Sequence, residues 1–230
     1  MNVTKKTTQI NDFTVAYYSE NDLAMVRKEV FVNKEYYFET DKANPVIIDC
    51  GANIGLTTLY FKELYPAATI YAFEANPFTF KLLEENVRNN NLSNVHCFNA
   101  ALSDVETTQS LSFNAITSFA GTIVFEHKGW TSIPIKTTKL SNYIGDLTTI
   151  DLMKIDVEGA EIQVIDDLLQ TGLLNIPSQY IIEYHYTEEN PTQRESLLSK
   201  FEPCFDYQFD TAIKYFGKLI CCVVLRCKKK

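Results

Sequence analysis

The stretch VIIDCGANIG, from Val46 to Gly55, decides the fold class. Its first half is an apolar run that closes on Asp49 and Cys50, which is typical of a strand buried on both faces. Its second half is a glycine-bearing turn, and the residues that follow it, 56–64, have the pattern of a helix. A buried strand, a glycine turn and a helix in succession predict the first unit of a parallel sheet.

The same succession recurs outward from this unit. Further strands are expected at Thr69–Glu74, Val95–Leu102, Asp151–Gly159 and Gln179–Tyr186. The last two apolar runs, 204–209 and 218–226, are joined by a loop too short for a parallel crossover, so we expect an antiparallel hairpin. The chain is predicted to be an α/β protein with a Rossmann-like fold: a mostly parallel seven-stranded sheet, helices on both faces and a C-terminal hairpin.

Two segments lie outside this repeat. Residues 1–44 are expected to form a short N-terminal extension, with a strand near Phe13–Tyr18 and a helix over Glu20–Val32. The stretch Ser103–Lys136 is less regular and is expected to form a hairpin or excursion beside the site. We expect residues 45–230 to form a single binding domain. Because insertions of this kind carry substrate specificity on a shared scaffold, we expect both segments to form a wall of its pocket.

Composition limits the partners. A chain of 230 residues with a net charge of −8 fits one acidic domain, which argues against a nucleic-acid partner. No segment approaches the roughly 20 apolar residues that cross a bilayer, so no membrane span is expected. The first residues lack the apolar core of a secretory signal, and the six cysteines show no CxxC spacing. We therefore expect a cytoplasmic protein with reduced thiols.

The turn GANIG differs from a dinucleotide-binding loop. In GxGxxG the middle glycine makes room for a pyrophosphate, whereas this turn has the bulkier Asn53 between Gly51 and Gly55. S-adenosylmethionine has no pyrophosphate, but it needs polar partners for its ammonium and carboxylate groups. Asp49 can serve the ammonium and the amides of the loop can serve the carboxylate. The turn therefore favours S-adenosylmethionine, with an NAD-type oxidoreductase as the alternative.

Glu74 lies at the end of the second predicted strand, where an acid can accept hydrogen bonds from a ribose diol. A solvated carboxylate at the end of a strand is the alternative, but the pairing with GANIG favours the ribose. Ala75 and Asn76 are then expected near one edge of the adenine. The turn from Ala101 to Asp104 is expected near the other edge, with Asp104 as a candidate partner of the adenine amine.

Five segments in this order resemble the FkbM family of methyltransferases: VIIDCGANIGLTTLYF, YAFEANP, FNAALSD, LMKIDVEGAE and IIEYH. The resemblance covers roughly residues 46–186, and the three motifs GANIG, EANP and KIDVEGAE together are specific. It implies a class I methyltransferase fold and S-adenosylmethionine as the methyl donor. It also implies O-methylation of a sugar, a glycan or a natural-product hydroxyl, with a small molecule or glycan as the acceptor.

Four polar residues follow the fourth and fifth predicted strands: Asp156, Glu158, Glu183 and His185. Glu183 and His185 point to the same side because side chains alternate along a strand. Neighbouring strands lie about 4.8 Å apart, so the four groups can converge on one pocket. We expect them to form the catalytic, acceptor-side cluster, in which Glu158 and Glu183 orient the acceptor.

Transfer of a methyl group to a hydroxyl needs a group that takes the proton. His185 is the leading candidate base, since a histidine titrates near neutral pH and a neighbouring carboxylate can orient it. Asp156 is the alternative, either as the base or as a contact to the cofactor, and Lys154 is expected to hold the carboxylates in place. The cluster could also hold Mg²⁺ or another divalent cation, but we favour a site without a metal.

Aromatic residues gather in the two segments outside the repeat, where they either face the acceptor or simply pack: Tyr36, Tyr37, Phe38, Phe119, Phe125 and Trp130. His96 and His127 belong to no motif and are expected to have no catalytic role. Two rival functions remain beside the NAD-type oxidoreductase: a non-catalytic, methyltransferase-like binding module, and an RNA methyltransferase. The acids at the expected strand ends argue against the first, and the negative charge argues against the second.

Overall fold

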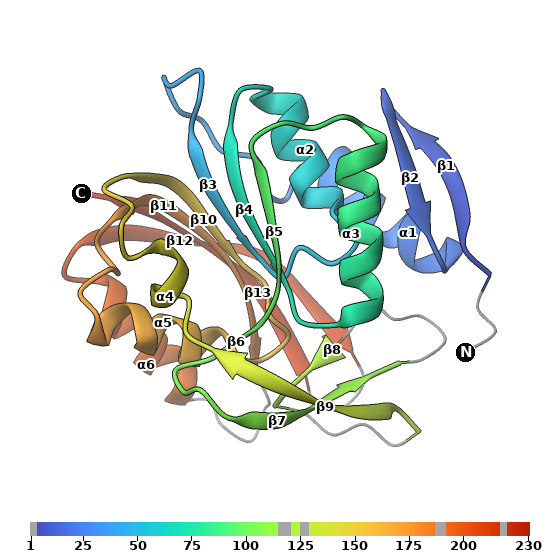
Figure 1. The fold of residues 1–230 in the computed structure, drawn as a ribbon. Helices are drawn as coiled ribbons and strands as arrows, with labels where there is room; N and C mark the ends of the chain where they lie inside the picture. Colours follow the sequence, from blue (N-terminus) through green and yellow to red (C-terminus); the bar gives the residue numbers. More distant parts are fainter. Residues whose placement is uncertain (1–3, 115–120, 125–128, 187–191, 217–219) are drawn as a thin grey trace.

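The computed structural model describes residues 4–114, 121–124, 129–186, 192–216 and 220–230. Within these residues, seven strands form one sheet in the order β12-β13-β11-β10-β3-β4-β5 (Figure 1). Its strands are β3 (Val46–Cys50), β4 (Thr69–Glu74), β5 (Val95–Asn99), β10 (Ile150–Ile155), β11 (Pro177–Tyr186), β12 (Phe205–Phe216) and β13 (Ile220–Lys229). Strands β3, β4, β5, β10 and β11 run parallel, and β13 pairs antiparallel with both β11 and β12. The predicted α/β class with a mostly parallel sheet is confirmed.

Helices cover both faces of the sheet (Figure 1). The helices of the domain are α2 (Leu56–Leu64), α3 (Pro77–Asn89), α4 (Ser141–Ile144), α5 (Glu161–Gln170) and α6 (Thr192–Phe201). Strand β3 shows why both faces are needed, because Ile47 belongs to the core on the side of α2 and α3 while Ile48 belongs to the core on the side of α4, α5 and α6. Both side chains are fully buried, as an apolar strand without polar alternation requires.

The N-terminal extension contains more structure than the sequence predicted. Strand β1 (Lys6–Ile10) pairs antiparallel with β2 (Phe13–Tyr17) through a two-residue turn in which Asn11 has a φ of 51°. Helix α1 (Glu20–Arg27) follows, capped by Ser19, and continues as a π-helical turn η1 (Lys28–Val32). The extension packs beside α3 and α2 (Figure 1), so it belongs to the same folded unit as the sheet.

The predicted third strand, Val95–Leu102, is divided in the structure. Strand β5 ends at Asn99. After Ala100, the two residues of β6 (Ala101–Leu102) pair with another strand, β9 (Thr131–Thr138). Strand β9 pairs antiparallel with β7 (Thr108–Phe113), which also pairs with β8 (Gly121–Thr122). The excursion is therefore a small second sheet, in the order β6-β9-β7-β8, below the main sheet in Figure 1.

Strand β10 is shorter than predicted. It ends at Ile155, so Asp156 and Glu158 belong to the turn before α5 and not to the strand. Glu158 has a φ of 55° and Gly159 a φ of 107°, and this left-handed turn reverses the chain into α5. Among the described residues, no helix is long and apolar enough to cross a membrane, and Cys50, Cys97, Cys204 and Cys227 are free thiols.

Candidate functional site

A cavity of about 250 Å³ opens where the parallel strands end at their carboxyl termini. Ligands of open α/β sheets bind at this edge, because the loops that follow the strands converge there. The loops after β3, β4 and β10 and the end of β11 all contribute to the lining, together with the N-terminal extension and the second sheet. The site is thus assembled from the ends of the parallel strands, the extension and the second sheet.

The turn after β3 packs closely against two other segments of the protein, at Asp156 and at Leu83. A Cβ atom at Gly51 would lie 1.7 Å from the carbonyl oxygen of Asp156, and Gly51 has a φ of 82°. At Gly55, which has a φ of 94°, a Cβ atom would lie 2.9 Å from the side chain of Leu83. The glycines therefore allow β3 and α2 to pack against β10 and α3.

Glu74 lines the cavity and is held from three directions. Its Oε2 accepts a hydrogen bond from the backbone N–H of Asn53 at 2.8 Å, while its Oε1 accepts from the backbone of Asn76 and the hydroxyl of Thr79, both at 2.8 Å. Burial raises the pKa of Glu74, and these hydrogen bonds oppose the rise. Each carboxylate oxygen can accept more than one hydrogen bond, so Glu74 is a fixed acceptor that can also receive hydroxyl groups.

Asp49 lies behind the cavity and not in its described lining. It is fully buried, and its Oδ2 accepts hydrogen bonds from the hydroxyls of Thr57 and Thr58 at 2.7 and 2.8 Å. Its Oδ1 lies 3.4 Å from Nζ of Lys154. The side chain therefore reaches the cavity only through Thr57 and Lys154, both of which line it.

The other residues expected at the cofactor divide into two groups. The cavity is lined by Gly51, Asn53, Glu74, Ala75, Ala101 and Asp156. The described lining does not include Asp49, Gly55, Asn76 or Asp104. The lining fits S-adenosylmethionine, since it joins a carboxylate suited to a ribose with a mainly apolar slot, formed by Phe73, Ala101 and Leu102, suited to an adenine.

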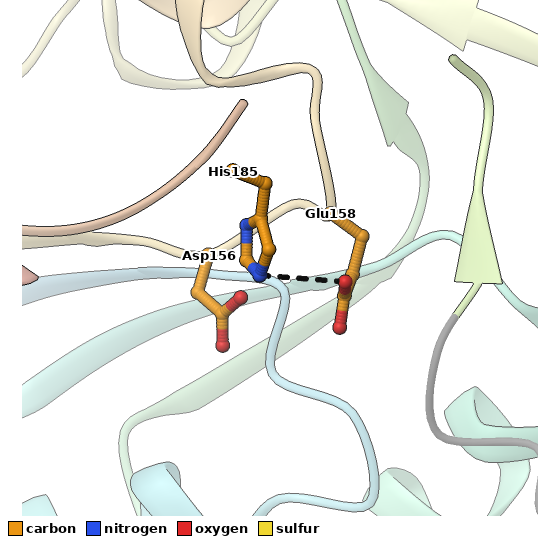
Figure 2. Close-up of side chains that lie close together, drawn as sticks. All are labelled: Asp156, Glu158 and His185. Atoms are coloured by element: carbon orange, nitrogen blue, oxygen red, sulfur yellow. Dashed lines mark ion pairs between the residues drawn. The ribbon is translucent and has the colours of Figure 1, made fainter. Parts of the chain in front are cut away.

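All four residues of the expected acceptor-side cluster line the same cavity: Asp156, Glu158, Glu183 and His185. Figure 2 shows the imidazole of His185 between the carboxylates of Asp156 and Glu158. Nε2 of His185 lies 3.5 Å from Oε2 of Glu158, and the His185 side chain is 4% exposed. The turn after β10 and the end of β11 bring these groups together.

Glu161, which the sequence analysis did not single out, fixes the histidine. Its Oε1 lies 3.1 Å from Nδ1 of His185 and accepts a hydrogen bond from the backbone N–H of Gly159 at 2.9 Å. Glu161 is fully buried at the first position of α5. A carboxylate in this place keeps the proton of a neutral imidazole on Nδ1, so that the Nε2 lone pair faces the cavity.

Lys154 lies among the carboxylates, as the sequence predicted. Its Nζ is 3.4 Å from both Oδ1 of Asp49 and Oδ2 of Asp156, and it donates hydrogen bonds to the carbonyls of Cys50 and Gly51. The charges of Asp156 and Asp49 raise the pKa of Lys154 against the effect of burial. Lys154 is therefore a permanent cation that joins β3 to β10 and does not act as a base.

Burial sets the protonation of the two acids beside His185. It raises the pKa of Glu158 to about 8, although the charge of His185 lowers it. It also raises the pKa of Asp156, against the opposing charge of Lys154. Both acids are thus poised closer to neutral pH than exposed carboxyl groups, which is common at functional sites.

The same three groups could hold a cation. Asp156, Glu158 and His185 each offer one ligand atom, and these atoms all lie within 4.8 Å of one another. Oxygen and imidazole ligands of this kind suit several divalent metals. Within the described part of the chain, this is the group of side chains with that geometry.

The remaining wall comes from the two segments outside the repeat. The extension contributes Met25, Val26, Glu29 and Tyr36, and the second sheet with its loops contributes Leu111, Gly121, Thr122, Ile123 and Trp130. The hydroxyl of Thr122 donates a 2.6 Å hydrogen bond to the carbonyl of Glu158, which ties β8 to the turn after β10. Tyr37 and Phe38 are not among the described lining residues, while Phe119, Phe125 and His127 lie outside the described residues.

Comparison with known proteins agrees with this arrangement. The model of the methyltransferase FkbM domain matches residues 49–216. Methyltransferase sdnD of Sordaria araneosa is 31% identical over 199 residues, which are 72% of this chain and 77% of that protein. The 31-O-demethyl-FK506 methyltransferase FkbM of Streptomyces tacrolimicus is 32% identical over 78 residues, which are 33% of this chain and 30% of that protein.

Among solved structures, methyltransferase FkbM from Methylobacillus flagellatus KT has a TM-score of 0.56 and 13% identity, over 82% of this chain and 45% of that one, and supports the fold. The family match covers most of the chain, including the turn after β3 and the ends of β10 and β11. It therefore decides between the methyltransferase and the rival NAD-type oxidoreductase or non-catalytic module. The chain belongs to the FkbM family and is an S-adenosylmethionine-dependent methyltransferase.

Proposed function

We propose that this enzyme methylates a hydroxyl group of a small molecule, either a saccharide or a natural product. The observation that carries the proposal is the shared cavity: Glu74, suited to the cofactor, and the imidazole of His185, fixed by Glu161, line the same space of about 250 Å³. A polar cluster with a histidine base suits an acceptor that must lose a proton, as a hydroxyl does.

The cofactor would lie along the loops after β3, β4 and β5. Glu74 would accept hydrogen bonds from the ribose hydroxyls, while Ala75, Ala101 and Leu102 would flank the adenine. When bound, S-adenosylmethionine supplies a methyl group on a positively charged sulfur. Asp49 would act indirectly, by fixing Thr57 and Lys154 through its buried contacts. Gly55 and Asn76 would shape the loops, and Asp104 would have no direct contact.

The acceptor would lie against the acceptor-side cluster. Glu158 and Glu183 would accept hydrogen bonds from its hydroxyl groups and orient the reacting oxygen. The Nε2 lone pair of His185 would take the proton of that hydroxyl, while the bond from Nδ1 to Glu161 stabilises the imidazolium that forms. Asp156 is the second candidate base, because its raised pKa lies closer to neutral pH than that of an exposed carboxyl.

Two observations support a small hydroxylated acceptor. The relative from Streptomyces tacrolimicus bears a name that specifies O-methylation, and this chain resembles it over 78 residues. The net charge of −8 and the carboxylates of the lining disfavour a nucleic-acid backbone, since phosphates require a basic surface. The same acidity is compatible with a neutral polyol.

The extension and the second sheet would wall the acceptor pocket. Described residues of both segments, 20–32 and 112–136, contribute to the lining, and they lie outside the strands that hold the cofactor loops. Hydrogen exchange measured with and without an acceptor would test this placement. Protection in these two segments is expected, and protection confined to the loops after β3 and β4 would contradict it.

The activity itself is tested with isotope-labelled S-adenosylmethionine and a panel of hydroxylated saccharides and natural products. We expect label in at least one hydroxylated compound, and no transfer to its analogue in which that hydroxyl is replaced by hydrogen. Transfer only to amines or to RNA would refute O-methylation, although it would leave the family assignment intact.

A further inference from the structure

Tyr36 makes contacts that the proposed mechanism has not yet used. It lies in an irregular segment of the extension, before the part of the chain that the family model matches, yet its side chain lines the cavity. Its hydroxyl lies 2.6 Å from Oε2 of Glu183 and 3.2 Å from Oδ2 of Asp156. It therefore links the end of β11 to the turn after β10, beside the contacts that His185 makes with Glu158 and Glu161.

The hydroxyl has one proton for these two neighbours. The shorter contact makes Glu183 the acceptor of that proton. Burial and the charges of Asp156 and Glu183 raise the pKa of Tyr36 well above its usual range, so the proton stays on the tyrosine. The side chain is 4% exposed, and water cannot replace the bond easily.

The backbone on both sides of Tyr36 is held by hydrogen bonds from strand β13. The guanidinium of Arg226, on β13, donates hydrogen bonds to the carbonyl of Glu35 at 2.6 Å and to the carbonyl of Tyr37 at 3.1 Å. Farther along, the side-chain amide of Gln179 donates to the carbonyl of Glu39 at 2.8 Å. These bonds hold the segment against the sheet, so the position of the Tyr36 ring is fixed by the fold.

We infer that Tyr36 is a positioning residue of the acceptor side, whose hydroxyl holds the carboxylate of Glu183, next to Asp156, in the arrangement that binds the acceptor. This inference rests on the proposed function in placing the acceptor at the cluster. The charged groups that face Tyr36 are Asp156, Glu183, Glu29 and Lys154, whose Nζ lies 5.3 Å from the centre of the ring. With Tyr36 in place, Oε2 of Glu183 is held by the tyrosine hydroxyl at the edge of the cavity.

Tyr36→Phe removes the hydroxyl and keeps the ring. Tyr37→Phe is the matched control, because the hydroxyl of Tyr37 also makes a 2.6 Å hydrogen bond to a glutamate, Glu39, but at the exposed surface. The first readout needs no acceptor: the titration of the Glu183 carboxyl carbon by NMR, assigned with Glu183→Gln. Because a hydrogen bond favours the charged carboxylate, Tyr36→Phe is expected to raise the titration midpoint by about one pH unit. Tyr37→Phe is expected to leave it unchanged.

The second readout uses a hydroxylated acceptor identified with the labelled donor. Tyr36→Phe is expected to lower kcat/KM for that acceptor about 10- to 100-fold, with unchanged affinity for S-adenosylhomocysteine. If Tyr36→Phe fails to fold, Arg226→Lys takes its place, because a lysine cannot donate to the carbonyls of both Glu35 and Tyr37 as the guanidinium does. Arg226→Lys is also expected to lower kcat/KM for the acceptor. An unchanged Glu183 titration or an unchanged kcat/KM would overturn the inference. If the wild-type enzyme methylates no hydroxyl at all, the proposed function fails, while the Glu183 titration still decides whether Tyr36 holds the carboxylate.

Discussion

Nδ1 of His185 lies 3.1 Å from Oε1 of Glu161, and both side chains are buried. The same Glu161 oxygen accepts the backbone N–H of Gly159, so the carboxylate also fixes the turn between β10 and α5. A buried carboxylate that holds an imidazole in one tautomer is the arrangement by which several enzymes orient a histidine base. The pair therefore connects the local fold of the KIDVEGAE segment to the proposed proton transfer.

Glu161→Gln tests this pair. The neutral amide is a weaker acceptor for the Nδ1 proton than the carboxylate, and it lacks the negative charge that stabilises the imidazolium. We expect kcat to fall about 10²-fold or more, with unchanged affinity for S-adenosylhomocysteine in calorimetry. Asp166→Asn, on the same helix but paired with Lys200 near the surface, is the control and should retain the wild-type kcat. A wild-type kcat in Glu161→Gln would show that Glu161 does not orient the base.

Glu74→Ala tests the position of the cofactor. If Glu74 accepts the ribose hydroxyls, its removal should weaken the binding of S-adenosylmethionine or S-adenosylhomocysteine by about 1.5–3 kcal/mol, the worth of hydrogen bonds to a charged group. Isothermal calorimetry gives this value directly. Glu84→Ala, an exposed acid on α3, should bind like the wild type. Equal affinity in all three proteins would remove Glu74 from the site.

Gly51→Ala tests the reason for the glycine in GANIG. The new Cβ atom would lie 1.7 Å from the carbonyl oxygen of Asp156, and the backbone has a positive φ, so both contact and conformation oppose it. We expect a loss of about 3 kcal/mol or more in the free energy of unfolding, measured by denaturant titration. Gly172 has a similar φ of 74°, but a Cβ atom there would have no other atom within 4 Å. Gly172→Ala should therefore lose only about 1–2 kcal/mol of the free energy of unfolding. Similar losses in the two variants would mean that the close approach has no energetic weight.

The pKa of Glu158 predicts a dependence of stability on pH. Burial raises this pKa from its ordinary 4.5 to about 8, so between these values the folded protein holds a proton that the unfolded chain releases. The contribution of Glu158 is therefore complete below pH 4.5 and is lost as the pH rises towards 8. About a third of the side chain is exposed, which keeps the effect small.

Thermal unfolding of the cofactor-free protein at about pH 5 and about pH 8 measures this effect. The wild type should have the lower Tm at the higher pH, and Glu158→Gln, which cannot titrate, should show a smaller difference. Asp156 and Glu74 also have raised pKa values and will leave part of the slope in the variant. The same slope in both proteins would mean that Glu158 titrates as an ordinary surface acid.

The sequence was sufficient for the sheet and for much of the cluster. The apolar run Val46–Cys50 predicts a strand buried on both faces, and the structure has it. Alternation along β11 predicts that Glu183 and His185 face the same side, and both line the cavity. These features depend on local periodicity, which a sequence displays directly.

Other features depend on contacts between distant segments. Tyr36 meets Glu183 across 147 positions of the chain, and no local pattern marks that contact. Glu161 stands within the quoted KIDVEGAE motif, but it was missed because the start of a helix, and not the alternation of a strand, directs it towards His185. The break of the third strand at Ala100 likewise follows from pairing with β9, more than thirty residues away.

His185→Ala, compared with His96→Ala on the exposed face of β5, tests the central claim that His185 takes the proton of an acceptor hydroxyl. With an acceptor from the labelled-donor panel, His185→Ala should lower kcat about 10²- to 10⁴-fold at neutral pH, while His96→Ala should keep the wild-type kcat. Both variants should bind S-adenosylhomocysteine with the wild-type affinity. The wild-type activity should survive chelation of divalent cations. A near-normal kcat in His185→Ala would transfer the role of base to Asp156 or Glu158. Activity that is lost on chelation and restored by Mg²⁺ would contradict the account, because His185 would then serve a metal bound with Asp156 and Glu158.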